Sequence, residues 1–136
     1  MIVVDTGPLV SVANRVDADH ARCLRLLSEI PDRLLLPEPL LGEIGYLLGT
    51  RCGARVEAEF IREVAQGGFD VVSLAAADWE RVADLVEKYA DLPLGLADAS
   101  VIAVAERFEI HQVATLDRRH FSVVRPKHIP AFTLLP

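Results

Sequence analysis

Residues 2–8 read Ile-Val-Val-Asp-Thr-Gly-Pro, and this segment decides the fold. Its β-branched run, residues 2–4, favours a strand, and the Thr-Gly-Pro that follows favours a turn. Because the run contains no alternating polar residues, we expect a strand that is buried on both faces. Strands of this kind belong to parallel sheets covered by helices, and Asp5 stands at the carboxyl end of this one.

The rest of the chain alternates further apolar runs with segments of helical spacing. Strands are predicted at residues 34–36, 70–74, 112–116 and 132–135. Helices are predicted at residues 9–14, 21–30, 40–48, 56–65, 78–89 and 97–108. The chain therefore predicts a three-layer α/β/α sandwich around a mainly parallel sheet of about five strands.

Three of the predicted helices carry more specific expectations. Gly49 is expected to end the helix over 40–48. The helix over 97–108 is apolar almost all round, which predicts burial on most sides. In the helix over 78–89, Arg81 is expected to face outward, and the residues expected to face inward are Trp79, Val82, Leu85 and Val86.

Length and composition limit the classes of protein that the chain can form. Its 136 residues fit a single domain, residues 1–136, and 51% apolar with 25% charged residues exclude a disordered chain. Lys and Arg total 14 against 20 Asp and Glu, and the net charge of −6 argues against a broad electrostatic binder of nucleic acid. Without a basic leader or an apolar run of about 18 residues, we expect a cytoplasmic protein with no membrane segment.

The cysteines and histidines show no spacing typical of a metal site. Cys23 and Cys52 are expected to be free thiols in a reducing compartment. The four histidines lack the spacing of zinc ligands, and none is placed as an obvious general acid.

Four carboxylates stand where an open α/β sheet binds its ligands. Asp5 and Asp117 close the first and fourth strands, and ligands bind beyond the carboxyl ends of such strands. Glu43 lies at the margin of the buried stripe of its helix, and Asp98 begins an unusually apolar helix. Each acid also has a structural explanation, as a turn residue, a helix cap or a glutamate at the edge of the core.

Four acids at one edge of a sheet repel one another, so their pKa values rise or a divalent cation holds them together. Oxygen ligands suit Mg²⁺ or Mn²⁺, and such an ion activates water for attack on a phosphodiester. Thr6, Ser100 and Thr115 each lie within two residues of one of the acids. They are placed either to hydrogen-bond the carboxylates or to serve as ordinary cap and strand residues.

The motifs around these acids resemble the PIN domain, and among its branches the VapC toxin of VapBC toxin–antitoxin pairs. The resemblance covers essentially the whole chain. The segments that carry it are Ile2-Val3-Val4-Asp5-Thr6, Leu41-Gly42-Glu43-Ile44, Leu96-Ala97-Asp98-Ala99 and Ala114-Thr115-Leu116-Asp117-Arg118-Arg119-His120-Phe121. One departure is that Gly95 stands where related sequences often have a further acid, with Asp91 the nearest candidate.

The resemblance implies a Mg²⁺- or Mn²⁺-dependent endoribonuclease that inhibits translation or growth. It also implies a homodimer and a VapB-type antitoxin that blocks the site. The family's acids carry over to Asp5, Glu43, Asp98 and Asp117, and its conserved hydroxyl to Thr115 and to Thr6. On this hypothesis the three aspartates hold the ion or ions, and Glu43 orients or deprotonates the attacking water or joins a second metal site.

Two arginines and three alternative functions stay open at this point. Arg118 and Arg119 follow Asp117 and are candidates for RNA contacts or for solvated surface. A haloacid-dehalogenase-like phosphohydrolase would use Asp5 as nucleophile, although residue 7 is Gly7 and the late lysine is Lys127. A receiver domain would need an Asp where Ser73 stands, and the third alternative is a PIN fold that binds without catalysis.

Overall fold

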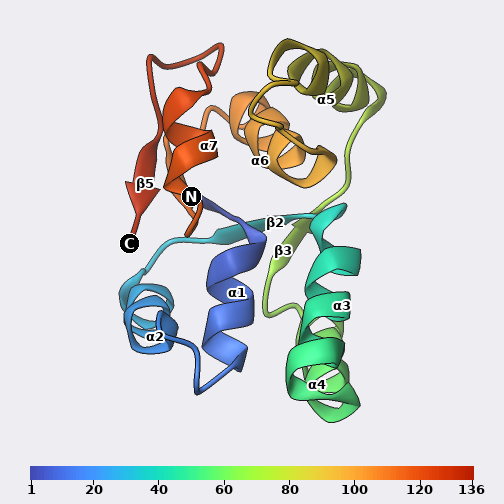
Figure 1. Cartoon of the computed structure of the whole chain (residues 1–136), viewed down its shortest axis with the longest axis vertical. Coiled ribbons are helices and arrows are strands. Elements are labelled where there is room, and N and C mark those ends of the chain that lie inside the picture. Colours follow the sequence, from blue (N-terminus) through green and yellow to red (C-terminus); the bar gives the residue numbers. More distant parts are fainter.

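The apolar run at the start of the chain forms the central strand of a five-stranded sheet. This is seen in a computed structural model that describes residues 1–136 (Figure 1). The strand order is β3-β2-β1-β4-β5, and every neighbouring pair is parallel. The strands are β1 (Ile2–Val4), β2 (Leu34–Pro37), β3 (Asp70–Val72), β4 (Gln112–Ala114) and β5 (Thr133–Leu135). The predicted parallel sheet of five strands is confirmed.

Seven helices cover the two faces of the sheet and complete the predicted three layers. They are α1 (Thr6–Ala13), α2 (His20–Glu29), α3 (Leu40–Cys52), α4 (Ala54–Ala65), α5 (Ala76–Lys88), α6 (Leu96–Arg107) and α7 (Arg118–Val123). Figure 1 shows α1 to α4 on one side of the sheet and α5 to α7 on the other. None of the helices combines the length and the apolar character needed to cross a membrane.

The largest differences from the predicted helices are the start of α1, the end of α3 and the presence of α7. The turn expected after β1 is the first turn of α1, which begins at Thr6 and accommodates Pro8 because the first amide groups of a helix have no partner within it. Gly49 lies inside α3, which ends instead at Cys52 and is followed by Gly53, where the backbone φ is 93°. The segment between β4 and β5 contains α7, a six-residue helix that was not predicted.

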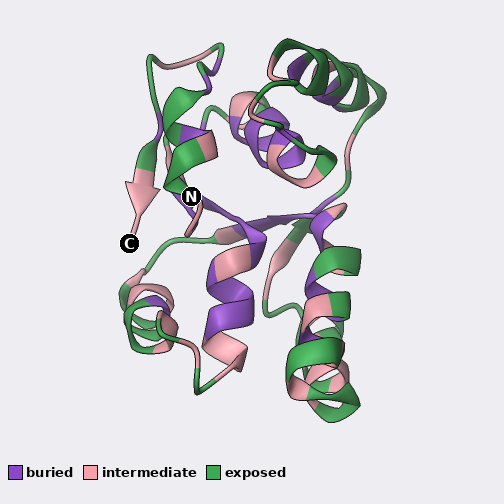
Figure 2. Cartoon of the chain, viewed as in Figure 1, coloured by how far each residue is buried: buried purple, intermediate pink, exposed green.

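The hydrophobic core lies on both faces of the sheet and contains 26 buried residues. Residues 99–105 of α6 are all buried, as the apolar sequence of that helix predicts (Figure 2). Burial of this much apolar surface is the main contribution to the stability of the fold. The buried strands and α6 together hold fixed the ends of β1 and β4, from which the site residues project.

Helix α5 buries a narrower face than the sequence predicted. It lies against α6 (Figure 1) and buries only Asp78, Val82 and Leu85. The predictions for Trp79 and Val86 are therefore wrong, since these residues are 47% and 36% exposed. The outward prediction for Arg81 is also wrong, because its side chain is 17% exposed and pairs with Glu106 at 2.7 Å.

The strand order reverses direction at β1. From β1 the chain proceeds through β2 to β3 on one side, and β4 and β5 are then added on the other side. Such a switch point opens a crevice beyond the carboxyl ends of the two strands that flank it. Asp5 directly follows β1, and Asp117 lies three residues beyond the end of β4. The topology therefore brings these two acids to one crevice.

Candidate active site

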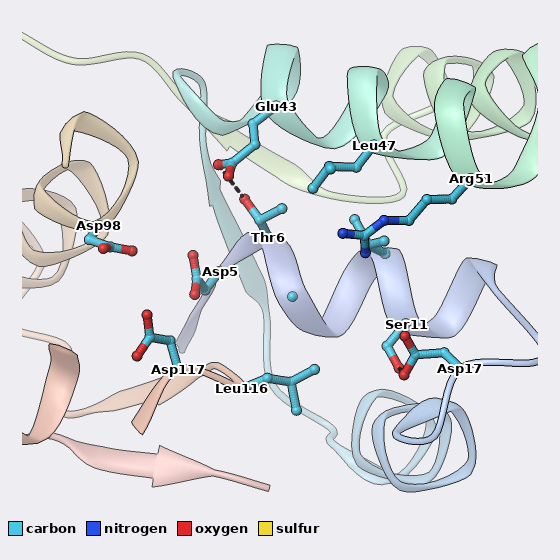
Figure 3. Close-up of a pocket in the computed structure, with 12 residues that line it drawn as sticks. Asp5, Thr6, Ser11, Asp17, Glu43, Leu47, Arg51, Asp98, Leu116 and Asp117 are labelled. Atoms are coloured by element: carbon cyan, nitrogen blue, oxygen red, sulfur yellow. Dashed lines mark hydrogen bonds between the residues drawn. The ribbon is translucent and has the colours of Figure 1, made fainter. Parts of the chain in front are cut away.

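A cleft of about 470 Å³ opens at this switch point (Figure 3). Five carboxylates and one guanidinium face it, together with small and apolar residues of α1, α3 and the segment after β4. The charged residues are Asp5, Asp17, Glu43, Asp98, Asp117 and Arg51. All four acids that the sequence singled out thus line the same cleft, although they come from four separate parts of the chain.

Asp5 is the most buried of these acids, with 6% of its surface exposed. Burial raises the pKa of Asp5 to about 6, because the charged carboxylate loses its hydration. Hydrogen bonds from the Thr115 hydroxyl and the Thr6 backbone lower the pKa, and the charges of Asp98 and Glu43 raise it. An acid in this setting is stabilised in its ionised form by a nearby cation.

Thr115 connects Asp5 to Asp117. Its hydroxyl donates to Asp5 Oδ2 at 2.7 Å and accepts the backbone N–H of Asp117 at 2.9 Å. The side chain is almost fully buried, so neither bond competes with bulk water. The backbone adds a further link, since the Asp5 N–H donates to the Ala114 carbonyl at 2.9 Å. Of the two roles that the sequence left open for Thr115, its hydroxyl is thus placed for the contact with a carboxylate.

Asp117 and Asp98 meet at His120. Asp117 caps α7, because its Oδ1 accepts the backbone N–H of His120 at 3.1 Å. The Nδ1 atom of His120 lies 2.9 Å from Asp98 Oδ2 and 3.0 Å from Asp117 Oδ2. The three side chains offer ligand atoms within 4.8 Å of one another. Sequence reasoning missed His120, and the available signal was its spacing of three residues from the capping Asp117.

Asp98 lies in the first turn of α6, where the partial positive charge of the helix terminus favours an anion. Burial nevertheless raises the pKa of Asp98, while the hydrogen bond from His120 lowers it and the charges of Asp117 and Glu43 raise it. Two of the four acids thus have raised pKa values for the same reasons, namely lost hydration and mutual repulsion.

Glu43 faces the same cleft from the first turn of α3. It is exposed, and its Oε2 accepts a hydrogen bond from the Thr6 hydroxyl at 3.0 Å (Figure 3). Thr6 is the first residue of α1 and directly follows Asp5, so this bond ties α3 to the end of β1. Thr6 therefore orients Glu43, in contrast to Thr115, which orients Asp5.

Other sequence candidates lie outside the group of acids. Ser100 is fully buried and donates to the Leu96 carbonyl of its own helix at 2.7 Å, so it does not contact a carboxylate. Arg118 donates to the carbonyl of Pro136, and both Arg118 and Arg119 are exposed without lining the cleft. Asp91, the candidate for a further acid, does not line the cleft either.

Two charged residues of the cleft were not anticipated, Asp17 and Arg51. Asp17 Oδ1 accepts the Ser11 hydroxyl at 2.9 Å and the Asp19 N–H at 2.8 Å, and these bonds hold the pKa of Asp17 below its ordinary value. Arg51 lies eight residues after Glu43 on α3, with Leu47 between them in the same cleft. This i, i+4, i+8 spacing along one helix face was the signal in the sequence.

The residues present fit a divalent cation. Carboxylate oxygens of Asp98 and Asp117 converge beside His120, and buried Asp5 adds a carboxylate whose pKa is raised by burial. A set dominated by carboxylate oxygens matches the preferences of Mg²⁺ and Mn²⁺.

This parallel sheet, with acids converging at its switch point, is that of the PIN domain: the chain belongs to this family, whose model matches residues 2–126. The chain is 34% identical to Ribonuclease VapC26 of Mycobacterium tuberculosis (strain ATCC 25618 / H37Rv) over 135 residues, which is 99% of this chain and 100% of that protein. The resemblance to VapC proteins inferred from the motifs is therefore confirmed.

Solved structures establish the same fold. VapC20 of Mycobacterium tuberculosis, described as a sarcin-ricin loop cleaving toxin, gives a TM-score of 0.82 at 22% identity, covering 96% of this chain and 99% of that one. FitAcB from Neisseria gonorrhoeae gives a TM-score of 0.64 at 18% identity, covering 86% of this chain and 88% of that one.

The alternatives to a PIN domain do not match the structure. Receiver domains have the strand order 2-1-3-4-5, whereas this sheet has the order β3-β2-β1-β4-β5. A dehalogenase-like site would need a lysine, but Lys127 does not line the cleft, and its backbone N–H donates to Glu106 at 2.7 Å.

Proposed function

We propose that this protein is a Mg²⁺- or Mn²⁺-dependent endoribonuclease and the toxin of a toxin–antitoxin pair. The observation that carries the proposal is the convergence of Asp5, Glu43, Asp98 and Asp117 on one cleft at the switch point of the sheet. Membership of the PIN family and the similarity to a protein named a ribonuclease support it.

Asp5, Asp98 and Asp117 would hold the cation, and Thr115 and His120 would fix the orientation of these carboxylates through the hydrogen bonds described above. When bound, a divalent ion supplies Lewis acidity, which lowers the pKa of a water nucleophile and offsets negative charge on the phosphoryl oxygens. Glu43 is the exposed acid of the group and is held by Thr6, so it would orient the attacking water and accept its proton.

The proposed partners come from the similarity to VapC proteins. The substrate would be RNA, and a toxin of this kind would act in the cytoplasm and inhibit translation or growth. A VapB-type antitoxin would neutralise it by covering the cleft, and the active form would be a homodimer. The similarity to VapC20, which is described as a toxin, supports this assignment.

The direct test is cleavage of total cellular RNA by the purified protein with Mg²⁺ or Mn²⁺, with and without EDTA. Wild-type protein should cut RNA at discrete sites, and both EDTA and Asp98→Asn should abolish cleavage. Circular dichroism would establish that the variant is folded. Cleavage that survives EDTA, or that Asp98→Asn leaves intact, would overturn the proposal, and RNA binding without cleavage would favour a non-catalytic module.

A further inference from the structure

The cleft is lined by a single basic residue, Arg51, at the opposite end of α3 from Glu43. Its side chain is exposed and forms no salt bridge. Figure 3 shows the guanidinium reaching from α3 across the cleft toward α1. Because Arg51 has no ion-pair partner, its guanidinium is free to contact a ligand in the cleft.

The neighbouring acid, Asp17, forms no ion pair or hydrogen bond with this guanidinium. Asp17 Oδ1 is occupied by the Ser11 hydroxyl and the Asp19 N–H. Arg51 contributes to the lowered pKa of Asp17 only through its charge, after both hydrogen bonds and without a salt bridge. The donors of Arg51 therefore stay available to a ligand in the cleft.

Helix geometry gives the spacing between Arg51 and Glu43 along α3. Eight residues separate Arg51 from Glu43 on α3, which corresponds to about 12 Å along the helix axis. Leu47 lies between them and gives the cleft an apolar wall at that point. A phosphate held by the acidic group would thus lie about two helix turns from the position of Arg51 on α3, whereas another phosphate of the same strand would lie nearer to it.

We infer that Arg51 binds a phosphate of the RNA strand other than the scissile one, so that the strand runs along α3 from the acidic group to Arg51. The inference rests on the proposed ribonuclease function. A guanidinium suits this role because its fixed donors can bind two phosphate oxygens at once. The contact also gives a polyanion a local point of attachment in a cleft whose other charged residues are all acids, and in a chain of net charge −6.

Salt dependence of RNA binding tests the inference. Labelled single-stranded RNA of random sequence would be titrated with Mg²⁺ present, in proteins that all carry Glu43→Gln so that the RNA stays intact. Removing one phosphate contact should reduce the slope of log affinity against log salt by about 0.7. We expect this change for Arg51→Gln, with weaker binding at low salt, and we expect Arg51→Lys to restore most of the slope.

Arg62→Gln is the matched control. Arg62 is also exposed, unpaired and in the last turn of a helix, but it lies on α4 and outside the cleft. This variant should keep the slope of the parent protein. With Glu43 restored, Arg51→Gln should raise KM for RNA and leave kcat nearly unchanged, because the contact is remote from the reacting atoms.

The outcomes separate this inference from the proposed function. If the wild-type protein cleaves RNA with metal, but Arg51→Gln and Arg62→Gln give the same salt slope and the same KM, the role of Arg51 alone is overturned. If the wild-type protein neither cleaves nor binds RNA, the proposed function is overturned, and the phosphate site with it.

Discussion

The hydroxyl of Thr115 donates a hydrogen bond of 2.7 Å to Asp5, a residue 110 positions away in the chain. The same hydroxyl accepts the N–H of Asp117, so one buried side chain positions two of the acids. Neighbouring strands make this possible, because β1 and β4 are paired in parallel and end at the same edge of the sheet.

Replacing Thr115 by valine removes the hydroxyl but keeps the shape of the side chain, so the variant tests the hydroxyl alone. The change leaves the Asp117 N–H without its partner and removes a bond that stabilises ionised Asp5, so we expect a loss of about 1–3 kcal/mol of stability. The pKa of Asp5 should rise further, and RNA cleavage should require a higher pH. Denaturant unfolding and a pH–rate profile measure both effects. Thr115→Ser should behave like the wild type, and equal defects in both variants would contradict the role of the hydroxyl.

Asp5 should make the metal-free protein less stable as the pH rises. Its pKa is about 6 in the folded protein against an ordinary 3.8, so between these values the folded state holds the proton more tightly than the unfolded state. The contribution of Asp5 to stability is thus present below pH 4 and lost as the pH rises through 6, and a pKa raised this far corresponds to about 3 kcal/mol.

Asp5→Asn tests directly whether ionisation of Asp5 lowers the stability of the folded protein. The variant should be more stable than the wild type in EDTA at pH 7.5 and should lose this advantage at pH 4, where wild-type Asp5 is mostly protonated. Urea denaturation at the two pH values gives the comparison, and the difference between the proteins cancels the other titrating groups. A variant that is less stable at pH 7.5 would show that ionised Asp5 is well compensated within the protein.

The fold could be predicted because its signals are local and repeated. Uniformly apolar strands and the apolar α6 require burial on both faces, and only a covered parallel sheet provides that burial. The short α7 could not be found in this way, because six residues are too few to show a helical period. The orientation of Trp79 depends on whether α5 packs on the sheet or on α6, which its own periodicity does not specify.

The placement of the acids was predictable to a similar extent. Asp5 and Asp117 follow strands, so topology alone takes them to the cleft. Arg51 and Asp17 join it only because α1 and α3 pack side by side, which is a tertiary relationship. His120 was missed because the histidines were compared with one another for metal spacing, whereas its partners are the carboxylates Asp98 and Asp117.

His120 should matter for metal binding. Its imidazole orients Asp98 and Asp117, and removing a partner of this kind typically costs 10–100-fold in metal affinity. We therefore expect His120→Asn to weaken Mn²⁺ binding by about tenfold or more, as measured by isothermal titration calorimetry. His111→Asn is the control. His111 is exposed and directly precedes β4, so it lies at the end of this strand opposite to the cleft. Equal affinities for the two variants would remove His120 from the site.

Divalent metal should stabilise the folded protein, because the ion offsets the repulsion among acids that the unfolded chain separates. At a Mg²⁺ or Mn²⁺ concentration 100 times the dissociation constant, the gain should be about 2.7 kcal/mol, seen as a higher Tm. The gain at neutral pH should be larger than the gain at pH 5. At pH 5 protons compete with the metal for Asp5 and Asp98, both of which have raised pKa values. Asp98→Asn should reduce the gain sharply, whereas Asp91→Asn, which alters an acid outside the cleft, should leave it unchanged. A gain of the same size in both variants would mean that the ion binds elsewhere on this acidic chain.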